Sequence, residues 1–421
     1  CIDHPLNKPV LSGDRVERGY GIIQPSVSVR LASATKSLFS RLYSSNSGID
    51  SYSSAVSDVY QDLFGNALFF GKGIYDVQVV EKTMEGKIPD NRVLSHDLLE
   101  GIYARTGFAS DIVFFDGFPK FYHEFIIRLH RWIRGDWQII GWLKSPYTPR
   151  GASSATVGFS FVDRWKIADN LRRSLIPLVA LCLIVYADFA NISSLVLNAY
   201  IIFALGSPFF VSLLNDVLSL KRVPTAIRFN DTLWQIRSTC VHVVLRLVFL
   251  LHQAFVSVSA ISVTLIRLFI TRRYLLQWQN STDVGQKLRG RLWEYYRAMW
   301  TTELISLSVI VVFGSAGHFD TIVVWCVVWF LSPLIGFAVS ISRTQKEILN
   351  RSDARMLRSL AFRTAGYFLN FSQKENNWLI QDHFQKMPKI TESSRLATAP
   401  TNLGIMFVSL YPLYAFGHLS L

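Results

Sequence analysis

Charged residues are scarce in this sequence of 421 residues. They make up 17% of the chain, whereas soluble domains carry about 25%. Hydrophobic residues make up 50%, which is too much for a disordered chain that stays in solvent. An ordinary soluble enzyme and a disordered protein are therefore both excluded. Because the apolar residues are concentrated after residue 170, the sequence predicts a membrane protein with a water-soluble first part.

Cysteine is rare, and its spacing excludes two kinds of site. The four cysteines, Cys1, Cys182, Cys240 and Cys326, are far apart, and the last three lie in apolar segments. This pattern is neither a disulfide framework nor a zinc-ligand cluster. We expect these side chains to be small buried hydrophobic groups.

Several catalytic signatures are also missing. The glycines around Phe69-Phe70-Gly71-Lys72-Gly73 match neither a Walker nor a dinucleotide-binding fingerprint, and no serine elbow accompanies a triad. No Asp-x-Asp occurs in the chain, so a transferase that needs a divalent cation would hold its ligands upstream of Cys1. The chain begins without an initiator Met or a signal peptide and stops within an apolar stretch. We therefore expect an internal piece of a longer protein.

Four apolar stretches have about the length that a spanning helix needs, roughly 20 residues. They are residues 174–190, 194–214, 299–315 and 321–341. Lys and Arg flank each pair of stretches, and the short connections within each pair lack both. By the positive-inside rule the basic flanks are cytoplasmic and these connections face outward. Much of the net charge of +13 is thus explained by basic loops that set the membrane orientation, and it does not indicate a nucleic-acid-binding surface.

Residues 241–270 are apolar but carry polar side chains that fall largely on one helical face. Among them are His242, Arg246, Gln253 and Arg267. Charges inside a membrane are costly and usually face a protein interior or a cavity. We expect an amphipathic helix or a re-entrant pair at the cytoplasmic interface, because a further simple span would place the basic loops at its ends on opposite sides.

The first 120 residues mix strand-like and helix-like patterns. Residues 21–29 have strand character, limited by Pro25, and residues 112–115 form a short apolar run that predicts a buried strand. Between them, Leu94–Gly101 is typical of a loop that turns into a helix. Interleaved strands and helices predict a partial α/β layer.

Asp97 lies at the start of that predicted helix and has two interpretations. Ser95 or Asp97 would cap the helix, with Glu100 three residues after Asp97, and the local sequence favours this. Alternatively, the Asp97 carboxylate is a general base, which requires an acceptor hydroxyl within hydrogen-bond reach. The two roles are compatible, because a residue at a helix start can also face a cleft.

The segment Arg128–Gln138 is the densest in arginine and tryptophan. As an interfacial helix it would place aromatic rings at headgroup depth and arginines toward water. As a binding site, its guanidinium groups would match phosphate oxygens bidentately, and an indole face would stack on a sugar ring. We expect both roles, because the segment shortly precedes the first predicted span. His123 and His130 have no third ligand at metal spacing, which argues against a zinc site.

In their order, these motifs resemble the processive membrane-integrated glycosyltransferases, such as cellulose, hyaluronan and chitin synthases. The matching residues are the strand Ile23-Gln24-Pro25, the Gly-rich Phe70–Gly73, the base position Ser95-His96-Asp97 and the helix Arg128–Trp132. Ser-His and Arg128 replace the Thr-Glu and the Gln of that pattern, which argues against a cellulose-type product.

Longer stretches resemble the cyclic β-1,2-glucan synthases, from about His4 to Gly404. The stretches that carry this resemblance are Gly19–Pro25, Val56–Gly65, Gly71–Val77, Leu94–Gly101, His130–Gln138, Thr271–Arg273, Asn377–Leu379 and Pro400–Gly404. The resemblance implies an inverting transferase that extends a β-1,2-glucan from UDP-glucose, with Asp97 as catalytic base and Arg128 and Arg131 on the donor diphosphate. The implied acceptor-binding residues are Trp132, Lys72, Gly71 and Gly73, and further pocket residues are Asp58, Asp62, Gln24 and His96. A divalent cation, Mg or Mn, is the expected cofactor, with its ligands upstream, so this chain alone is expected to be inactive.

The predicted fold class is a partial α/β glycosyltransferase A-type domain followed by an α-helical transmembrane bundle with interfacial helices. Residues 1–145 would be the C-terminal part of the catalytic domain, 146–345 the transmembrane region, and 346–421 a cytoplasmic linker and the start of a following domain. The expected partners are UDP-glucose, the growing glucan, the lipid bilayer and a phosphorylase-like domain of the same chain, without nucleic acid. The expected location is the inner (cytoplasmic) membrane, as a multi-pass protein whose catalytic face is cytoplasmic. The alternatives are another processive synthase, of the cellulose, chitin or hyaluronan type, and a non-enzymatic membrane transporter or scaffold.

Overall fold

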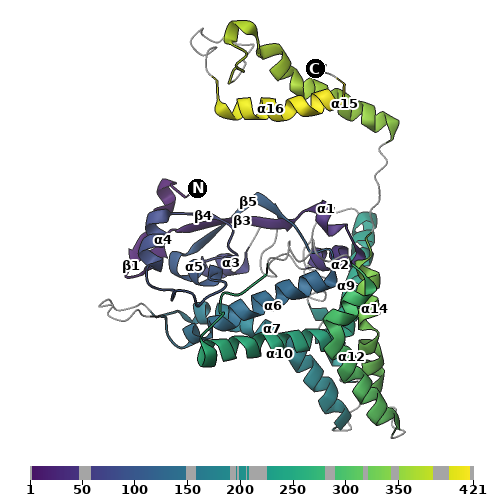
Figure 1. The fold of residues 1–421 in the computed structure, drawn as a ribbon. Coiled ribbons are helices and arrows are strands. Elements are labelled where there is room, and N and C mark those ends of the chain that lie inside the picture. Colours follow the sequence, from purple (N-terminus) through teal and green to yellow (C-terminus); the bar gives the residue numbers. More distant parts are fainter. Residues whose placement is uncertain are drawn as a thin grey trace. The chain divides into compact units, whose positions relative to one another are not determined.

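The computed structural model of the chain contains two compact units, Cys1–Arg343 and Thr344–Leu421. The part of the chain that the structure describes is mostly helical, with two small sheets (Figure 1). The predicted domain boundaries, after residues 145 and 345, stay predictions. The structure describes residues 2–46, 58–147, 158–189, 196, 199–204, 206–207, 225–279, 290–315, 321–342, 350–382 and 398–417.

A three-stranded sheet lies in the first part of the larger unit. Its order is β4-β3-β5, with β3 (Ile22–Val29) antiparallel to β4 (Ile74–Tyr75) and parallel to β5 (Thr106–Asp116). Pro25 has no N–H to donate to a ladder, and the register of β3 against β5 shifts directly after it. The strand predicted over residues 21–29 is confirmed, with an irregularity at its proline. The second sheet is a hairpin of β1 (Val10–Ser12) and β2 (Arg15–Arg18).

The apolar run at residues 112–115 is a strand, as predicted, but it is not buried. Residues 112–115 belong to the C-terminal half of β5, where their side chains are exposed, and Phe115 is 64% exposed. Among the described residues β5 pairs along β3 alone, so no neighbouring strand covers its other edge there. A continuous apolar run indicates a strand without saying what covers it, which is why the expected burial was wrong.

Short helices pack around the sheet (Figure 1). α5 (Asp97–Ala104) packs against α4 (Val77–Met84), and it buries Leu99, Ile102 and Tyr103 in an apolar core that it shares with the start of α7. The other short helices of this unit are α1 (Leu31–Ala34), α2 (Leu38–Asn46), α3 (Val59–Phe64), 3-10 helices at Pro5–Asn7 and Ile140–Leu143, and a π-helix at Ile266–Thr271. A 3-10 helix at Lys374–Asn376 belongs to the smaller unit.

α6 (Tyr122–Gln138) begins in a second, aromatic core. Tyr122 stacks on Phe249 with ring centroids 3.9 Å apart, and its hydroxyl lies 3.0 Å from Nδ1 of His252. Phe249 is fully buried and directly precedes α10 (Leu250–Leu265). The N-terminal end of α6 is thus attached to the N-terminal end of α10.

The other end of α6 is attached to the segment that follows α10. Arg134 donates hydrogen bonds to the carbonyl oxygens of Gln277 and Leu275, at 2.8 and 3.1 Å. Gln138 donates to the Leu275 carbonyl as well, at 2.9 Å. Because both ends of α10 are held at opposite ends of α6, the two helices lie lengthwise against each other (Figure 1).

Two described helices are long and apolar enough to cross a membrane, Phe161–Ala187 and Leu250–Thr271. The first of them contains most of the predicted span 174–190. Where the sequence predicts the span 321–341, the structure has a helix pair bent by 43°, which passes the same criterion if its halves count as one span. The helices of this region are α7 (Phe161–Phe189), α9 (Thr225–Val248), α10, α12 (Leu292–Ser315), α13 (Thr321–Phe330) and α14 (Ser332–Ser340).

For residues 241–270, where the sequence left open an amphipathic helix or a re-entrant pair, the structure has parts of two helices. The chain breaks at Phe249, between α9 and α10. This break leaves His242 and Arg246 on α9, so the following stretch reaches the hydropathy of a membrane span. Its lengthwise packing against α6 still agrees with the interfacial or re-entrant placement that the sequence favours.

The other two predicted spans have different outcomes. Residues 299–315 are helical within α12, but α12 is not among the described helices that are apolar enough to cross. The side chains of residues 313–315 lie outside the described part of the chain, so this result covers Leu292–Val312 alone. Most of the predicted span 194–214 lies outside the described residues.

The smaller unit contains two packed helices, α15 (Arg351–Phe371) and α16 (Pro400–Ala415). The Asn350 side chain caps α15 by accepting from the Ser352 amide. Pro400 opens α16 at a position where a missing N–H costs nothing.

Candidate active site

A pocket of about 510 Å³ lies between the chain segment before β4, the start of α5, one face of α6 and the start of α7. Its polar lining comes from segments that are far apart in the sequence. The polar and aromatic residues that line it are Phe69, Phe70, Lys72, Ser95, Asp97, Asp116, Arg128, Arg131, Trp132, Asp136, Asn170, Arg173 and Ser174.

Asp97 faces this pocket from the first turn of α5. The residue at the cap position is His96, and no side chain makes a capping hydrogen bond there. The capping interpretation of Ser95 and Asp97 is therefore wrong, and Ser95 Oγ instead donates to Asp97 Oδ2 at 3.2 Å. Burial raises the pKa of Asp97, and the hydrogen bond from Ser95 opposes the shift. A carboxyl group in this setting is suited to accept a proton from a bound hydroxyl group.

Gly71 packs directly against the Asp97 carboxylate. Its φ is +76°, and a Cβ atom there would lie 2.6 Å from Asp97 Oδ1. A side chain at this position would meet both a left-handed backbone and a steric clash. Gly73 also has no room for a side chain, since a Cβ atom there would lie 2.7 Å from the Ile23 carbonyl oxygen. The Gly-rich motif thus allows the backbone to approach the predicted base.

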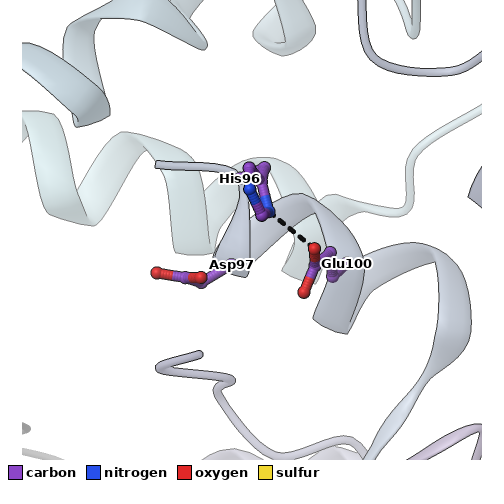
Figure 2. Close-up of side chains that lie close together, drawn as sticks. All are labelled: His96, Asp97 and Glu100. Carbon is purple, nitrogen blue, oxygen red and sulfur yellow. Dashed lines mark ion pairs between the residues drawn. The ribbon is translucent and has the colours of Figure 1, made fainter. Parts of the chain in front are cut away.

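His96 and Glu100 lie beside Asp97 but do not line the pocket. His96 Nδ1 pairs with Glu100 Oε1 at 2.6 Å, and the Tyr75 hydroxyl donates to Glu100 Oε2 at 3.0 Å. The hydrogen bond with Glu100 raises the pKa of His96. Figure 2 shows Asp97 extending away from the His96–Glu100 pair. His96 is a predicted pocket residue, but its side chain does not line this cavity.

His96, Asp97 and Glu100 form a group whose ligand atoms lie within 4.8 Å of one another. One imidazole and two carboxylates are a donor set that divalent metals accept. Of the three, however, only Asp97 lines the pocket that contains Arg128 and Arg131. These residues therefore do not fit a cation that would contact a diphosphate in the pocket.

Arg128, Arg131 and Trp132 lie on one face of α6 because they are three and four residues apart, and all three line the pocket. The Arg128 guanidinium lies 4.6 Å from the centroid of the Trp132 ring and 4.0 Å from the Asp116 carboxylate. The Arg131 guanidinium lies 4.8 Å from the Trp278 ring centroid. Two guanidinium groups beside an indole can hold a phosphate group and a sugar ring side by side.

Lys72 reaches the pocket opposite α6 and forms an ion pair with Asp116, at the end of β5. Burial raises the pKa of Asp116, but the hydrogen bonds from Lys72 and the Gly117 amide outweigh this effect, so the pKa lies below the usual value for an aspartate. Asp116 therefore stays ionised near neutral pH and partly neutralises Lys72 and Arg128. Sequence reasoning missed Asp116, because an aspartate after an apolar strand carries no motif.

Three predicted pocket residues lie outside the cavity. Gln24 is buried in β3, where it donates to the Leu68 carbonyl at 2.8 Å and accepts from the Phe70 amide at 2.7 Å. Asp58 caps α3 by accepting from an amide of its first turn, and Asp62 is exposed on the same helix. The prediction is corrected: Gln24 supports the segment that carries Lys72, and the two aspartates do not line the pocket.

Asp136, Asn170 and Arg173 also line the pocket and were missed as site residues. Asp136 belongs to the Arg-Gly-Asp-Trp part of the α6 motif, whereas the other two come from α7. Their proximity depends on how the two helices pack, which no local pattern encodes. Gly135 permits a close approach of α6 to the start of α5, since its Cβ would lie 2.8 Å from Ser95 Cβ.

Comparison with known proteins agrees with the resemblance that the motifs carry. No family model matches the chain. The chain is 35% identical, over 425 aligned positions and 98% of its own length, to the cyclic beta-(1,2)-glucan synthase NdvB of Rhizobium meliloti (strain 1021). It spans 15% of the length of that relative. The resemblance to the cyclic β-1,2-glucan synthases is thereby confirmed, and the chain is similar to one segment of such a synthase.

Proposed function

We propose that this chain is the part of a membrane-integrated inverting glucosyltransferase that extends a β-1,2-glucan from UDP-glucose. The observation that carries the proposal is the pocket in which Asp97 shares one cavity with Arg128, Arg131 and Trp132. A proton acceptor, two groups for an anion and a platform for a sugar are the parts that such a transfer needs.

In the proposed reaction, Asp97 takes the proton of the acceptor hydroxyl. The hydroxyl oxygen forms a bond to the anomeric carbon of the glucosyl donor from the face opposite the diphosphate. The bond between that carbon and the diphosphate breaks, and its electron pair leaves with UDP. Arg128 and Arg131 stabilise the charge that develops on the leaving diphosphate.

Trp132 and Lys72 serve the acceptor in this proposal. The Trp132 indole presents a face on which the terminal glucosyl unit stacks, and Lys72 donates hydrogen bonds to its hydroxyl groups. The ion pair with Asp116 directs the Lys72 ammonium group into the pocket. A divalent cation, Mg or Mn, would add positive charge at the diphosphate, and we place its ligands outside this chain.

The proposal includes the location and the partners of the enzyme. The pocket faces the cytoplasm, where UDP-glucose is made, and the apolar helices lie in the inner membrane. A phosphorylase-like domain of the same polypeptide would act on the glucan after its synthesis. The similarity to a cyclic glucan synthase and the apolar helices support this arrangement.

Product analysis of the full-length protein tests the proposal. Membranes that contain it are incubated with labelled UDP-glucose, released UDP is measured, and the polymer is analysed for linkage. We expect UDP release coupled to a 1,2-linked glucan, without turnover of UDP-N-acetylglucosamine. A 1,4-linked glucan would establish another processive synthase instead, and glucan transport without UDP release would establish a transporter.

A further inference from the structure

The pocket continues past Trp132 into the seam between α6 and α7. Asp136 lies one helical turn after Trp132 on the same face of α6, since the two are four residues apart. Asn170 and Arg173, three residues apart, come from α7, which packs against α6 (Figure 1). All four side chains line the same cavity.

The polar groups at this end of the pocket are organised by contacts with one another. Asn170 Nδ2 donates to Asp136 Oδ1 at 3.0 Å, and Arg173 donates to Asn170 Oδ1. Burial raises the pKa of Asp136 to about 7, although Arg173 and Asn170 oppose the shift. Enclosing a carboxyl group in this way is costly, and an apolar residue would pack the two helices without that cost.

The chemistry of this end of the pocket differs from that of the Arg128–Arg131 end. The ionised form of Asp136 repels phosphate, so this end of the pocket is a poor site for a second anion. A carboxylate accepts up to about four hydrogen bonds, and amide and guanidinium groups donate. Acceptors and donors side by side match the vicinal hydroxyl groups of a neutral sugar.

The spacing along α6 also suits a sugar chain. One turn of helix rises about 5.4 Å, which is comparable with the length of one pyranose unit. A terminal glucosyl unit on Trp132 would therefore place the next unit of the same chain beside Asp136.

We propose that Asp136, Asn170 and Arg173 form an acceptor subsite that binds the hydroxyl groups of the second glucosyl unit from the growing end. This inference rests on the proposed transferase function and deepens it. The subsite makes the enzyme prefer acceptors of two or more 1,2-linked units over free glucose. It also holds the chain against α6 and α7 while its end is extended at Asp97.

The test compares binding of 1,2-linked glucotriose and of glucose to the full-length protein, by calorimetry, in the wild type and in Asp136→Asn. We expect the variant to lose about tenfold in affinity for the trisaccharide, as the loss of a hydrogen bond implies, and to bind glucose unchanged. Asn170→Ala removes the partner of Asp136 and should show the same selective loss. Glu124→Gln is the control, because Glu124 is also an acidic residue of α6 whose pKa burial raises, and it does not line the pocket.

The outcomes separate the subsite from the transferase proposal. Equal losses for glucose and glucotriose, or unchanged binding of both in Asp136→Asn and Asn170→Ala, would overturn the subsite. Transfer from UDP-glucose is measured on the same preparations. A wild type that binds the trisaccharide selectively but never releases UDP would contradict the transferase and leave the subsite standing.

Discussion

Asp97 takes its properties from three neighbours, the distant Gly71 and the adjacent Ser95 and His96. Gly71 leaves room for its carboxylate only because it has no side chain. Ser95 donates a hydrogen bond to Asp97 Oδ2, and His96, at the helix cap position, leaves the Asp97 side chain directed toward the pocket. Burial favours the protonated form and the Ser95 hydrogen bond favours the ionised form, so the state of Asp97 depends on small changes around it.

The first prediction concerns the pH dependence of glucosyl transfer. Because burial raises the pKa of Asp97, the carboxylate becomes protonated and inactive at a higher pH than an ordinary aspartate would. Activity should therefore be lost as pH falls through this raised pKa. Ser95→Ala removes a group that lowers the pKa, so the acidic limb of kcat/KM should move to higher pH. An acidic limb that stays in place or moves to lower pH in Ser95→Ala would contradict this account.

The sequence predicts some of the individual pocket residues and misses others, for a physical reason. Asp97, Arg128, Arg131 and Trp132 lie in short contiguous motifs, so their side chains reach the pocket from elements that the motifs themselves specify. Asp136 needs its partners from α7, which follow it by 34 and 37 residues. A contact between helices depends on how they pack, and the packing of α6 against α7 cannot be derived from a single sequence.

Among the elements, the segment before β4 is positioned by a side chain from β3. Gln24 binds the backbone of Leu68 and Phe70 on either side of Phe69, and Gly71 and Lys72 follow directly. The sequence identifies Gln24 as part of a motif but does not show that it holds another segment. This role arises only in the fold, where the backbone of Leu68–Phe70 lies beside β3. Gln24 is therefore a positioning residue for the pocket.

The second prediction is that Gln24→Ala lowers both stability and activity. The substitution leaves a buried carbonyl and a buried amide without partners, which costs about 1–3 kcal/mol for each group. It also frees the segment that carries Lys72, so kcat for transfer should fall with little change in the KM for UDP-glucose. Thermal unfolding and steady-state kinetics of the full-length protein measure the two effects.

Gln61→Ala is the matched control for this prediction. Gln61 makes a similar pair of contacts, with the backbone amide and carbonyl of Phe108, but these lie away from the pocket. It should reduce the melting temperature and leave kcat unchanged. Equal losses of kcat in the two variants would mean that Gln24 acts through overall stability alone.

Sequence reasoning at the scale of elements succeeds where the pattern is local. The strand at 21–29 and the helix after Leu94 both follow from periodicity and turn residues. The exposure of residues 112–115 and the break at Phe249 do not. Both depend on which neighbours the segment meets, and hydropathy records only how apolar the segment is.

For the whole molecule, the contacts of α6 relate the pocket to the membrane helices. The pocket lies along α6, and both ends of α10 are attached to α6, at Tyr122 and at Arg134. Leu250–Thr271 is apolar enough to cross a membrane. Because both of its ends are attached to α6, however, we expect them to lie on the same side of the membrane as the pocket. This expectation agrees with the charge pattern of the loops.

The third prediction tests this arrangement with single cysteines in a protein whose native cysteines are replaced by serine. A membrane-impermeant maleimide should label Ser193→Cys in intact cells, because position 193 belongs to the predicted outward connection, outside the described residues. Gln279→Cys, after α10, should react only in opened cells. Labelling of Gln279→Cys in intact cells would mean that α10 crosses the membrane.

The central claim is that Asp97 is the catalytic base of a UDP-glucose transferase. The most direct test is the Asp97→Asn variant of the full-length protein, with glucosyl transfer and UDP-glucose binding measured separately at neutral pH. We expect transfer to fall by a factor of about 10² to 10⁴, as the loss of a general base implies, while the donor Kd stays within about twofold. Glu100→Gln, at a neighbouring acid that does not line the pocket, should keep its activity. Transfer at the wild-type rate by Asp97→Asn would contradict the account.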